Sequence, residues 1–447
     1  MIILPSLEIV PAKYNVSTNT LLSQIPIDGT GDFTVTRATS PTTNQSTRVN
    51  ALGLIETVAD NVPRLDYPIG GGCPALLVEP SAQNLCLQSE DLDIFPWNTT
   101  NTAVTVNVTG TTDPAGGNKA DQIFETAASG LHFLAQTMTI VNGTTYAGSV
   151  FLKKATGSPD WMQVAFSTTG LAGFANFNLT SGTVGNALAG CTGRIENYGN
   201  GWYRCTLIQT ANANGTSGGP IIVFTNNTNS ITRFVSYTGN TATSIYAWGA
   251  QLETGSVATS YIPTVASGIT RAADVIRKTN ITSLIGQSEG TVYFEVEVTA
   301  EARDRLFFTL DSASNSLIQG WVDSSRQVKM FIQNAGATVM TTLSSSALSI
   351  GYHKVAFAYN AATNGCEMFI DGVQNPVASR TVTGAGLPAF NNFTFGGFIT
   401  STTDVFKAHI RAGELHPNRL TNTQLALLTS PYTSYSSMAS ALSYTLG

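Results

Sequence analysis

Thr291-Val-Tyr-Phe-Glu-Val-Glu-Val298 is the stretch that identifies the fold class most clearly. Apolar and polar side chains alternate along it with a period of two, which is the pattern of a half-buried β-strand. One face of this strand carries only apolar residues, namely Val292, Phe294, Val296 and Val298. The sequence therefore predicts a strand that lies over a hydrophobic core.

A predicted hairpin follows this strand. Lys354–Tyr359 and Cys366–Ile370 have strand composition and flank a turn at 360–365, and Asp371-Gly372 gives a second, tight turn. Together with the aromatic run Phe390–Phe398, this pattern resembles laminin-G or concanavalin-like lectin domains. We therefore expect a β-sandwich over residues 284–412.

The preceding section, residues 91–265, consists of short alternating runs divided by Asn, Gly, Ser and Thr, with no 3.6-residue period. Such spacing is typical of a β-sandwich or jelly roll. In outline it resembles the jelly rolls of carbohydrate-binding modules, through Gly201–Arg204 and the late strand Tyr246–Leu252. Residues 266–283, polar and interrupted by Gly268, are predicted to be a linker.

After the second sandwich, residues 413–447 are predicted to form one short helix and a surface tail. The helix is expected within Leu415–Ser430, with its cap near Thr421, and with Leu425 and Leu428 on a common face. The prediction for the whole chain is an all-β fold of two β-sandwich (jelly-roll) domains.

The composition excludes several classes of function. Only 11% of the 447 residues are charged, against 42% apolar, and the formal net charge is -6. Because no basic cluster is present, we expect no nucleic-acid partner. No run approaches the roughly 18 apolar residues needed to span a bilayer, so we expect no membrane insertion. The N-terminus has no basic region of a secretory signal, which predicts a soluble product made in the cytosol.

Residues 1–90 are expected to form an extended, irregular arm. Within it, Arg48–Asp91 contains a triple glycine at 70–72 and a set of prolines that fix extended and turn geometry; these prolines are Pro63, Pro68, Pro74 and Pro80. Such a segment buries little surface against itself, so we expect it to pack on neighbouring domains, other subunits or a particle. We interpret it as an anchoring and assembly segment.

The sequence of this arm resembles a family of tailed-bacteriophage virion proteins. The family pattern appears here in DFTVTRATS (Asp32–Ser40), in RVNALGLIETVADNVPRLDY (Arg48–Tyr67) and in GGCPALLVEPSAQNLCLQSED (Gly71–Asp91). It continues in Ile245–Thr264 and in Thr270–Ile276. The resemblance implies a surface component of a phage particle, assembled in the bacterial cytoplasm and contacting other virion proteins, with a homo-oligomer, by analogy a trimer.

Aromatic residues provide the candidates for ligand binding, because sugar rings stack on exposed Trp and Tyr faces. Trp161, which follows Ser158-Pro-Asp160 at a strand start, is the preferred glycan contact, with Asp160 and Tyr203 beside it. Trp202 and Trp248 are expected to be core residues. A host-glycan-binding adhesin is therefore an alternative function.

Catalytic and metal chemistry have weaker candidates. Glu295 and Glu297 share one strand face at about 6.6 Å, a spacing compatible with a glycoside hydrolase, but the acidic run stops at Thr299. The four histidines lack a sequence-near carboxylate or nucleophile, and the five cysteines are interpreted as small buried residues. A structural calcium site is an alternative for Asp304, Asp311, Asp323 and Asp371. We expect no catalytic residues, no metal site and no cofactor, and predict a non-enzymatic head fibre, tail fibre or decoration protein.

Overall fold

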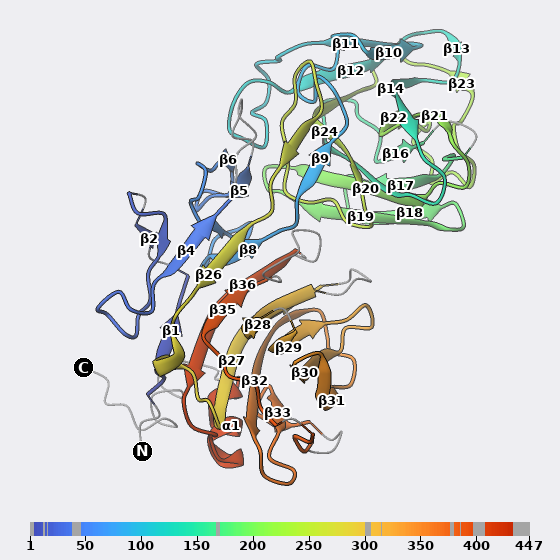
Figure 1. Ribbon diagram of the computed structural model, residues 1–447. Helices are drawn as coiled ribbons and strands as arrows, with labels where there is room; N and C mark the ends of the chain where they lie inside the picture. Colours follow the sequence, from blue (N-terminus) through green and yellow to red (C-terminus); the bar gives the residue numbers. More distant parts are fainter. Residues whose placement is uncertain are drawn as a thin grey trace.

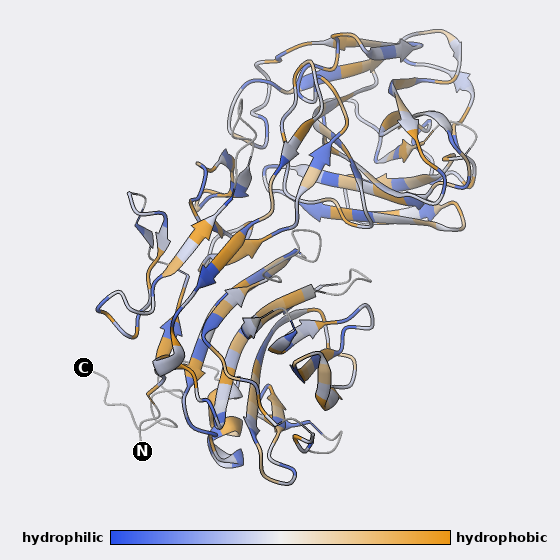
Figure 2. Ribbon diagram, viewed as in Figure 1, coloured by the Kyte–Doolittle hydropathy of each residue, from blue (hydrophilic) through white to orange (hydrophobic). Residues whose placement is uncertain are grey.

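The fold is all-β, with about 49% strand and 3% helix, which confirms the predicted class. The computed structural model describes residues 4–431 except 12–13, 16, 38–45, 167–169, 300–304, 314, 376–379, 385 and 397–406. Two lobes are visible in Figure 1, and each is a pair of packed antiparallel sheets. Hydrophobic and hydrophilic residues alternate along many of the strands (Figure 2), as expected when one face of a sheet is buried.

The first sandwich is formed by the middle of the chain. One sheet has the order β10 (Trp97–Thr100), β14 (Phe133–Ile140), β22 (Ile221–Phe224), β16 (Trp161–Ala165), β17 (Phe174–Asn178) and β18 (Thr183–Ala187), with β21 (Gly215–Gly218) beside β14. The other has the order β11 (Thr102–Thr105), β12 (Asp121–Glu125), β24 (Ser244–Thr254), β15 (Thr145–Lys154), β20 (Trp202–Thr210) and β19 (Cys191–Asn197). A short ribbon of β13 (Ser129–Gly130) and β23 (Tyr237–Thr238) lies beside them.

The second sandwich combines strands from both ends of the chain. One sheet has the order β34 (Val373–Gln374), β33 (Glu367–Ile370), β32 (Gly351–Asn360), β27 (Glu289–Val298), β36 (Ala408–His416), β8 (Ala75–Val78) and β7 (Arg64–Asp66), with β1 (Leu7–Ile9) also paired to β36. The facing sheet has the order β2 (Tyr14–Asn15), β3 (Thr20–Leu21), β4 (Phe33–Thr36), β26 (Val275–Lys278), β35 (Asn392–Phe395), β28 (Arg305–Ala313), β29 (Ser316–Val322), β30 (Val328–Asn334) and β31 (Ala337–Ser344).

The N-terminal segment is therefore an integral part of the second sandwich, and the expectation of an extended, irregular arm needs correction. Its strands β1, β7 and β8 extend one sheet, and β2, β3 and β4 extend the other. Of the three packing partners expected for this segment, the structure supplies neighbouring domains of the same chain. Of its other strands, β5 (Thr47–Val49) and β6 (Ile55–Thr57) form a small hairpin between the lobes, and β9 (Ala82–Asn84) pairs outside both sandwich sheets. Pairing between strands that are distant in sequence cannot be predicted from the local periodicity of hydrophobic residues.

The predicted linker at 266–283 is also corrected. It contains β25 (Ile269–Arg271), which pairs with β9 (Ala82–Asn84), and β26, which lies between β4 and β35 in the second sandwich. A short 3-10 helix, η1 (Thr282–Leu284), follows. The polar residues of this stretch had suggested a loop, but strand pairing on both sides of β26 satisfies its backbone groups.

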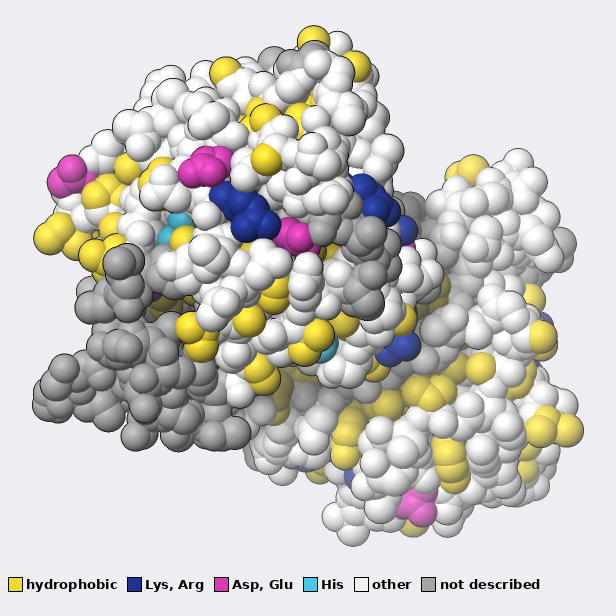
Figure 3. Space-filling model, turned by 90° about the horizontal axis from the view of Figure 1, so that it is seen from below, with side chains coloured by type: hydrophobic (Ala, Val, Ile, Leu, Met, Phe, Trp, Pro, Cys, Tyr) yellow, Lys and Arg dark blue, Asp and Glu magenta, His cyan; other side chains and the backbone are white. Residues whose placement is uncertain are grey.

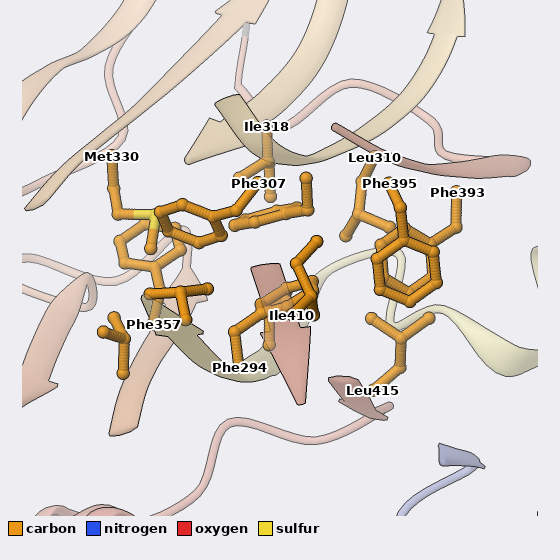
Figure 4. Close-up of a cluster of buried hydrophobic side chains, with 14 of the residues drawn as sticks. Phe294, Phe307, Leu310, Ile318, Met330, Phe357, Phe393, Phe395, Ile410 and Leu415 are labelled. Carbon is orange, nitrogen blue, oxygen red and sulfur yellow. The ribbon is translucent and has the colours of Figure 1, made fainter. Parts of the chain in front are cut away.

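The core of the second sandwich is rich in phenylalanine (Figure 4). Phe294 of β27 is stacked on Phe308 of β28 with ring centroids 4.8 Å apart, and it makes edge contacts with Phe307, Phe393 and Phe395. Burying one such ring contributes about 1.5–3 kcal/mol. The predicted apolar face of the 291–298 strand is thus confirmed, as is the hairpin of β32 and β33.

The predicted helix is confirmed as α1 (Asn422–Thr429). Thr421 is its N-cap, and its side chain and that of Gln424 form a reciprocal capping box. Leu425 is buried against Tyr293 and Phe369, and Leu428 packs beside them. Leu415 and His416, which the prediction allowed in the helix, belong to β36 instead. Within the described residues, no helix has the length and hydropathy to cross a membrane.

Candidate functional site

A buried network of five ionised side chains lies where the two sandwiches meet. We call it the joint and define it as Arg37, Arg64, Glu79, Arg271 and Asp274, whose side chains are at most 2% exposed. Arg64 is central: its Nη1 donates to Glu79 at 2.7 Å, and its Nη2 donates to Asp274. Because a buried charge is tolerated only when it is paired, each member depends on the others.

Two further arginines complete the joint. Arg37 donates from Nη1 to Asp274 at 2.8 Å, and Arg271 donates from Nη1 to Glu79 at 2.7 Å. Burial alone would raise the pKa of both carboxyl groups, yet Arg64 and Arg37 hold the pKa of Asp274 below its ordinary value. Arg271 and Arg64 likewise hold the pKa of Glu79 well below the usual range. Both carboxylates are therefore ionised at neutral pH.

Hydrogen bonds continue from the joint into the first sandwich. Arg271 donates to Ser260 Oγ at 2.8 Å, and Ser260 Oγ donates to Glu79 at 2.6 Å. Ser260 and Thr259 lie on the segment that leaves β24, and the carbonyl of Thr259 accepts from Arg204 Nη1 of β20 at 2.6 Å. One continuous polar chain thus connects the interior of the second sandwich with a central strand of the first.

The members of the joint come from the stretches on which the expected resemblance rests. Each of its members lies in one of the stretches that carry the resemblance: Arg37 in TVTRATS, Arg64 in VPRLDY, Glu79 in LLVEP, and Arg271 and Asp274 in TRAAD. Sequence reasoning interpreted the N-terminal arm, which contains three of these stretches, as an anchoring and assembly segment and did not find the network. The available signal was Glu79, a single charge at the end of the apolar run 74–78, which must find a partner if the run is buried.

A cleft of about 390 Å³ opens between the lobes beside the joint. It is lined by β19 residues of the first sandwich, including Arg194 and Glu196, and by Glu297 and His409 of the second. His409 contacts Glu297 through Nδ1 at 2.6 Å and Asp66 through Nε2 at 3.0 Å. Burial would lower the pKa of His409, but the two carboxylates raise it to about 10. His409 is thus a fixed cation at neutral pH, which does not suit a general base.

A second, smaller pocket of about 180 Å³ lies at one end of the first sandwich. We call it the Glu125 pocket, since the Glu125 carboxylate at the end of β12 is its buried acidic group. Tyr237 lies beside Glu125 and donates its hydroxyl hydrogen to that carboxylate. Other walls come from the 157–159 turn and from Asn226, Asn227 and Asn240.

The three predicted glycan contacts do not form one surface. Trp161 is half-buried at the start of β16, and its ring lies against Gly185, where a Cβ would approach Cζ3 to 2.4 Å. Tyr203 belongs to the other sheet, where it packs against the core and beneath Gly182. Asp160 accepts from Lys154 Nζ at 2.5 Å and from Thr180 Oγ1 at 2.5 Å. Asp160 and Trp161 do not line the Glu125 pocket, but Asn227, which does, accepts through Oδ1 from both of their backbone amides.

The candidate glycosidase pair is held by ion pairs with β36. Glu295 faces Arg411 at 3.5 Å, and Glu297 contacts His409. The two carboxylates therefore have separate cationic partners, and their side chains are 23% and 29% exposed. Trp202 and Trp248, predicted to be core residues, are 1% and 2% exposed, which confirms that prediction.

The aspartates considered for calcium do not converge. Asp311 accepts from Asn392 and Arg277, Asp323 closes the turn before β30, and Asp371 contacts His353 at 2.5 Å. Asp304 lies outside the described residues. Across the part of the chain that the structure describes, no three His, Cys, Asp or Glu side chains are grouped so that they could hold a metal ion.

The expectation that no histidine has a sequence-near carboxylate is wrong for His416, since Glu414 lies 3.1 Å from it. His353 and His409 also contact carboxylates, but their partners are distant in sequence. His132 is fully buried between the carbonyls of Asn101 and Tyr237. All five cysteines are free; contrary to expectation, Cys73 is exposed and Cys191 is half-buried.

Comparisons with known proteins give likeness in structure only. No family model and no curated protein matches the chain. The carbohydrate-binding module (CBM40) of a Ruminococcus gnavus sialidase, solved with α2,6-sialyllactose, matches 34% of this chain and 92% of its own, at 13% identity and a TM-score of 0.29. The NanB sialidase of Streptococcus pneumoniae matches 35% of this chain and 27% of its own, at 12% identity and a TM-score of 0.29. A pentraxin of Limulus polyphemus matches 35% of this chain at 12% identity.

Proposed function

We propose that this chain is a non-enzymatic structural protein on the surface of a phage particle, where it displays two β-sandwiches as one rigid unit. The observation that carries the proposal is the joint. Residues from the stretches that resemble tailed-phage virion proteins form a fully buried ion network between the lobes, where no substrate can reach them. A display protein needs such a fixed arrangement, whereas an enzyme needs reactive groups that a substrate can reach.

The surface supports the same proposal. Charged side chains are sparse on the face shown in Figure 3, where uncharged groups cover most of the area. Weakly charged sandwich faces can associate side by side without the cost of burying many unpaired charges. We therefore propose a homo-oligomer, with a trimer as the form suggested by fibre proteins. Attachment through a free N-terminal arm is not part of the proposal, because that segment forms strands of the second sandwich.

A glycan-binding adhesin is the second candidate, and the Glu125 pocket is the observation that favours it. This pocket is concave and polar, and Asn227 in its wall accepts from the backbone amides of the predicted contacts Asp160 and Trp161. Glycan binding and a structural role are compatible, since a particle-surface protein can also hold on to a host. A glycoside hydrolase finds less support, because Glu295 and Glu297 are each paired with a cation of β36.

Electron microscopy of purified particles, combined with mass spectrometry of their proteins, tests the structural proposal. We expect the chain among the particle proteins in a fixed copy number, and density for two linked sandwiches at the surface with three-fold symmetry. Light scattering of the isolated chain should give the mass of a trimer. Absence of the chain from purified particles would overturn the proposal.

A further inference from the structure

The Glu125 pocket has the size of a single-ring ligand. Its volume of about 180 Å³ is below the roughly 300–1,000 Å³ of pockets for drug-sized molecules. It lies where four separate segments meet: the end of β12, the 157–159 turn, the 226–227 turn and residues 237–243. Because these segments approach from different directions, the pocket could surround the end of a chain-like ligand.

The floor of the pocket is pre-organised. Glu125 is only 4% exposed, and its carboxylate accepts from the Tyr237 hydroxyl and, at 2.8 Å, from the backbone N–H of Asn240. The backbone of Asn226 in turn hydrogen-bonds to Tyr237. An ionised carboxylate has about four acceptor sites, so this one can still accept hydrogen bonds from ligand hydroxyl groups.

The rim supplies amide groups. Asn226, Asn227 and Asn240 are exposed at the pocket, and Oδ1 of Asn227 is already held by two backbone N–H groups at 2.6 and 3.2 Å. Its amide NH₂ is therefore the part that can donate to a ligand. Thr243 adds a hydroxyl, and the buried Pro159 adds an apolar wall. Amides and hydroxyls around a carboxylate, with one apolar surface, complement the hydroxyl groups and C–H face of a sugar ring.

The charge of the residues that line the pocket decides which kinds of sugar it can accept. The residues that line the pocket include one carboxylate and, among those described, no lysine, arginine or histidine. A ligand carboxylate placed here would face Glu125 without a compensating cation, and like charges at short distance in a buried site are strongly unfavourable. We propose that the Glu125 pocket binds the terminal ring of a neutral saccharide and excludes acidic sugars. This proposal deepens the glycan-binding candidate above and rests on it.

Asn226→Gly is the most informative variant. Asn226 has a φ of 50°, which glycine adopts without strain, so the change removes the side-chain amide and keeps the backbone contact to Tyr237. Asn280→Gly is the matched control, because Asn280 is also exposed, with a φ of 60°, but lies in the second sandwich. Glu125→Gln keeps the shape of the floor and removes its charge.

The experiment measures binding of the full chain to immobilised glycans that end in neutral hexoses or N-acetylhexosamines, and to matched glycans that end in sialic or uronic acids. We expect binding to a neutral terminus only. Affinity should fall about threefold to tenfold in Asn226→Gly, the range of one hydrogen bond, and stay unchanged in Asn280→Gly. Glu125→Gln should weaken neutral binding and reduce the discrimination against acidic glycans.

Three outcomes would overturn the inference. Binding confined to acidic termini would contradict the charge argument. Neutral binding that is unaffected by both Asn226→Gly and Glu125→Gln would place the glycan site elsewhere. Binding to no glycan at all would remove both the pocket proposal and the adhesin candidate, while the structural proposal would still be decided separately by the particle proteins.

Discussion

Replacing Asp274 with asparagine should destabilise the protein more than any change of a surface charge. In the joint, three guanidinium groups face two carboxylates, and Asp274→Asn would leave three facing one. Asp274 accepts from Arg37, from Arg64 and from the backbone N–H of Glu79, and an asparagine amide cannot replace all of these acceptor contacts. Loss of one partner from a buried ion pair costs about 3–5 kcal/mol, and we expect a loss in that range.

The assay is urea unfolding of the full chain, followed by the fluorescence of its five tryptophans. Asp323→Asn is the control, because Asp323 forms its ion pair with Lys329 near the surface and should contribute no more than about 1 kcal/mol. The free energy of unfolding is taken from the transition that includes the second sandwich, since two lobes can unfold separately. If Asp274→Asn cost no more than Asp323→Asn, the joint would not be the buried, mutually dependent network described above.

A double-mutant cycle tests the charge count itself. Arg37→Met leaves two guanidinium groups facing two carboxylates and keeps the Arg64 contacts, so it should cost less than Asp274→Asn. In the double variant, two guanidinium groups face one carboxylate, which restores the net charge of the native joint. Its cost should therefore fall below the sum of the single costs by about 1–3 kcal/mol. Strict additivity would show that Arg37 and Asp274 do not interact.

Three further predictions follow from individual contacts. The pKa of His409 is raised to about 10 in the folded chain, against 6.5 for an ordinary histidine. The ion pairs of His409 therefore contribute fully to stability below about pH 6.5, and this contribution is lost as the pH rises through 10. Over this pH window, the free energy of unfolding should fall by about a few kcal/mol more in the native chain than in His409→Gln. Thr421→Ala removes the cap of α1 and should lower stability by about 1 kcal/mol in thermal unfolding, whereas Thr421→Ser should not. Phe294→Ala should lower the unfolding free energy by about 3–5 kcal/mol, because the ring contacts four other phenylalanines.

The parts of the fold that depend on neighbouring residues could be predicted from the sequence. The alternation at 291–298, the hairpin closed by Asp371-Gly372 and the Thr421 cap each depend on neighbouring residues, and the structure confirms all three. Asp371 and Gly372 both have positive φ values, of 50° and 82°, as such a hairpin turn requires. The pairing of β1 with β36 joins Leu7 to Leu415, residues almost the whole chain apart in sequence. The local hydrophobic periodicity of either strand cannot predict such a pairing. The predictions of an irregular arm and of a linker were wrong for this reason, because the strands in both segments pair with partners distant in sequence.

The candidate sites show the same division between local and distant information. Trp161 and Asp160 were proposed because an aromatic residue at a strand start is a local feature. Glu125, at the end of a different strand, becomes a pocket floor only together with residues 226–243, which are distant in sequence. The joint is harder still, because its five members come from four separate stretches of sequence. Glu79 nevertheless carries usable information, because it is a single charge at the end of the apolar run 74–78. If that run is buried, its carboxylate must have a cationic partner, and the structure supplies Arg64 and Arg271.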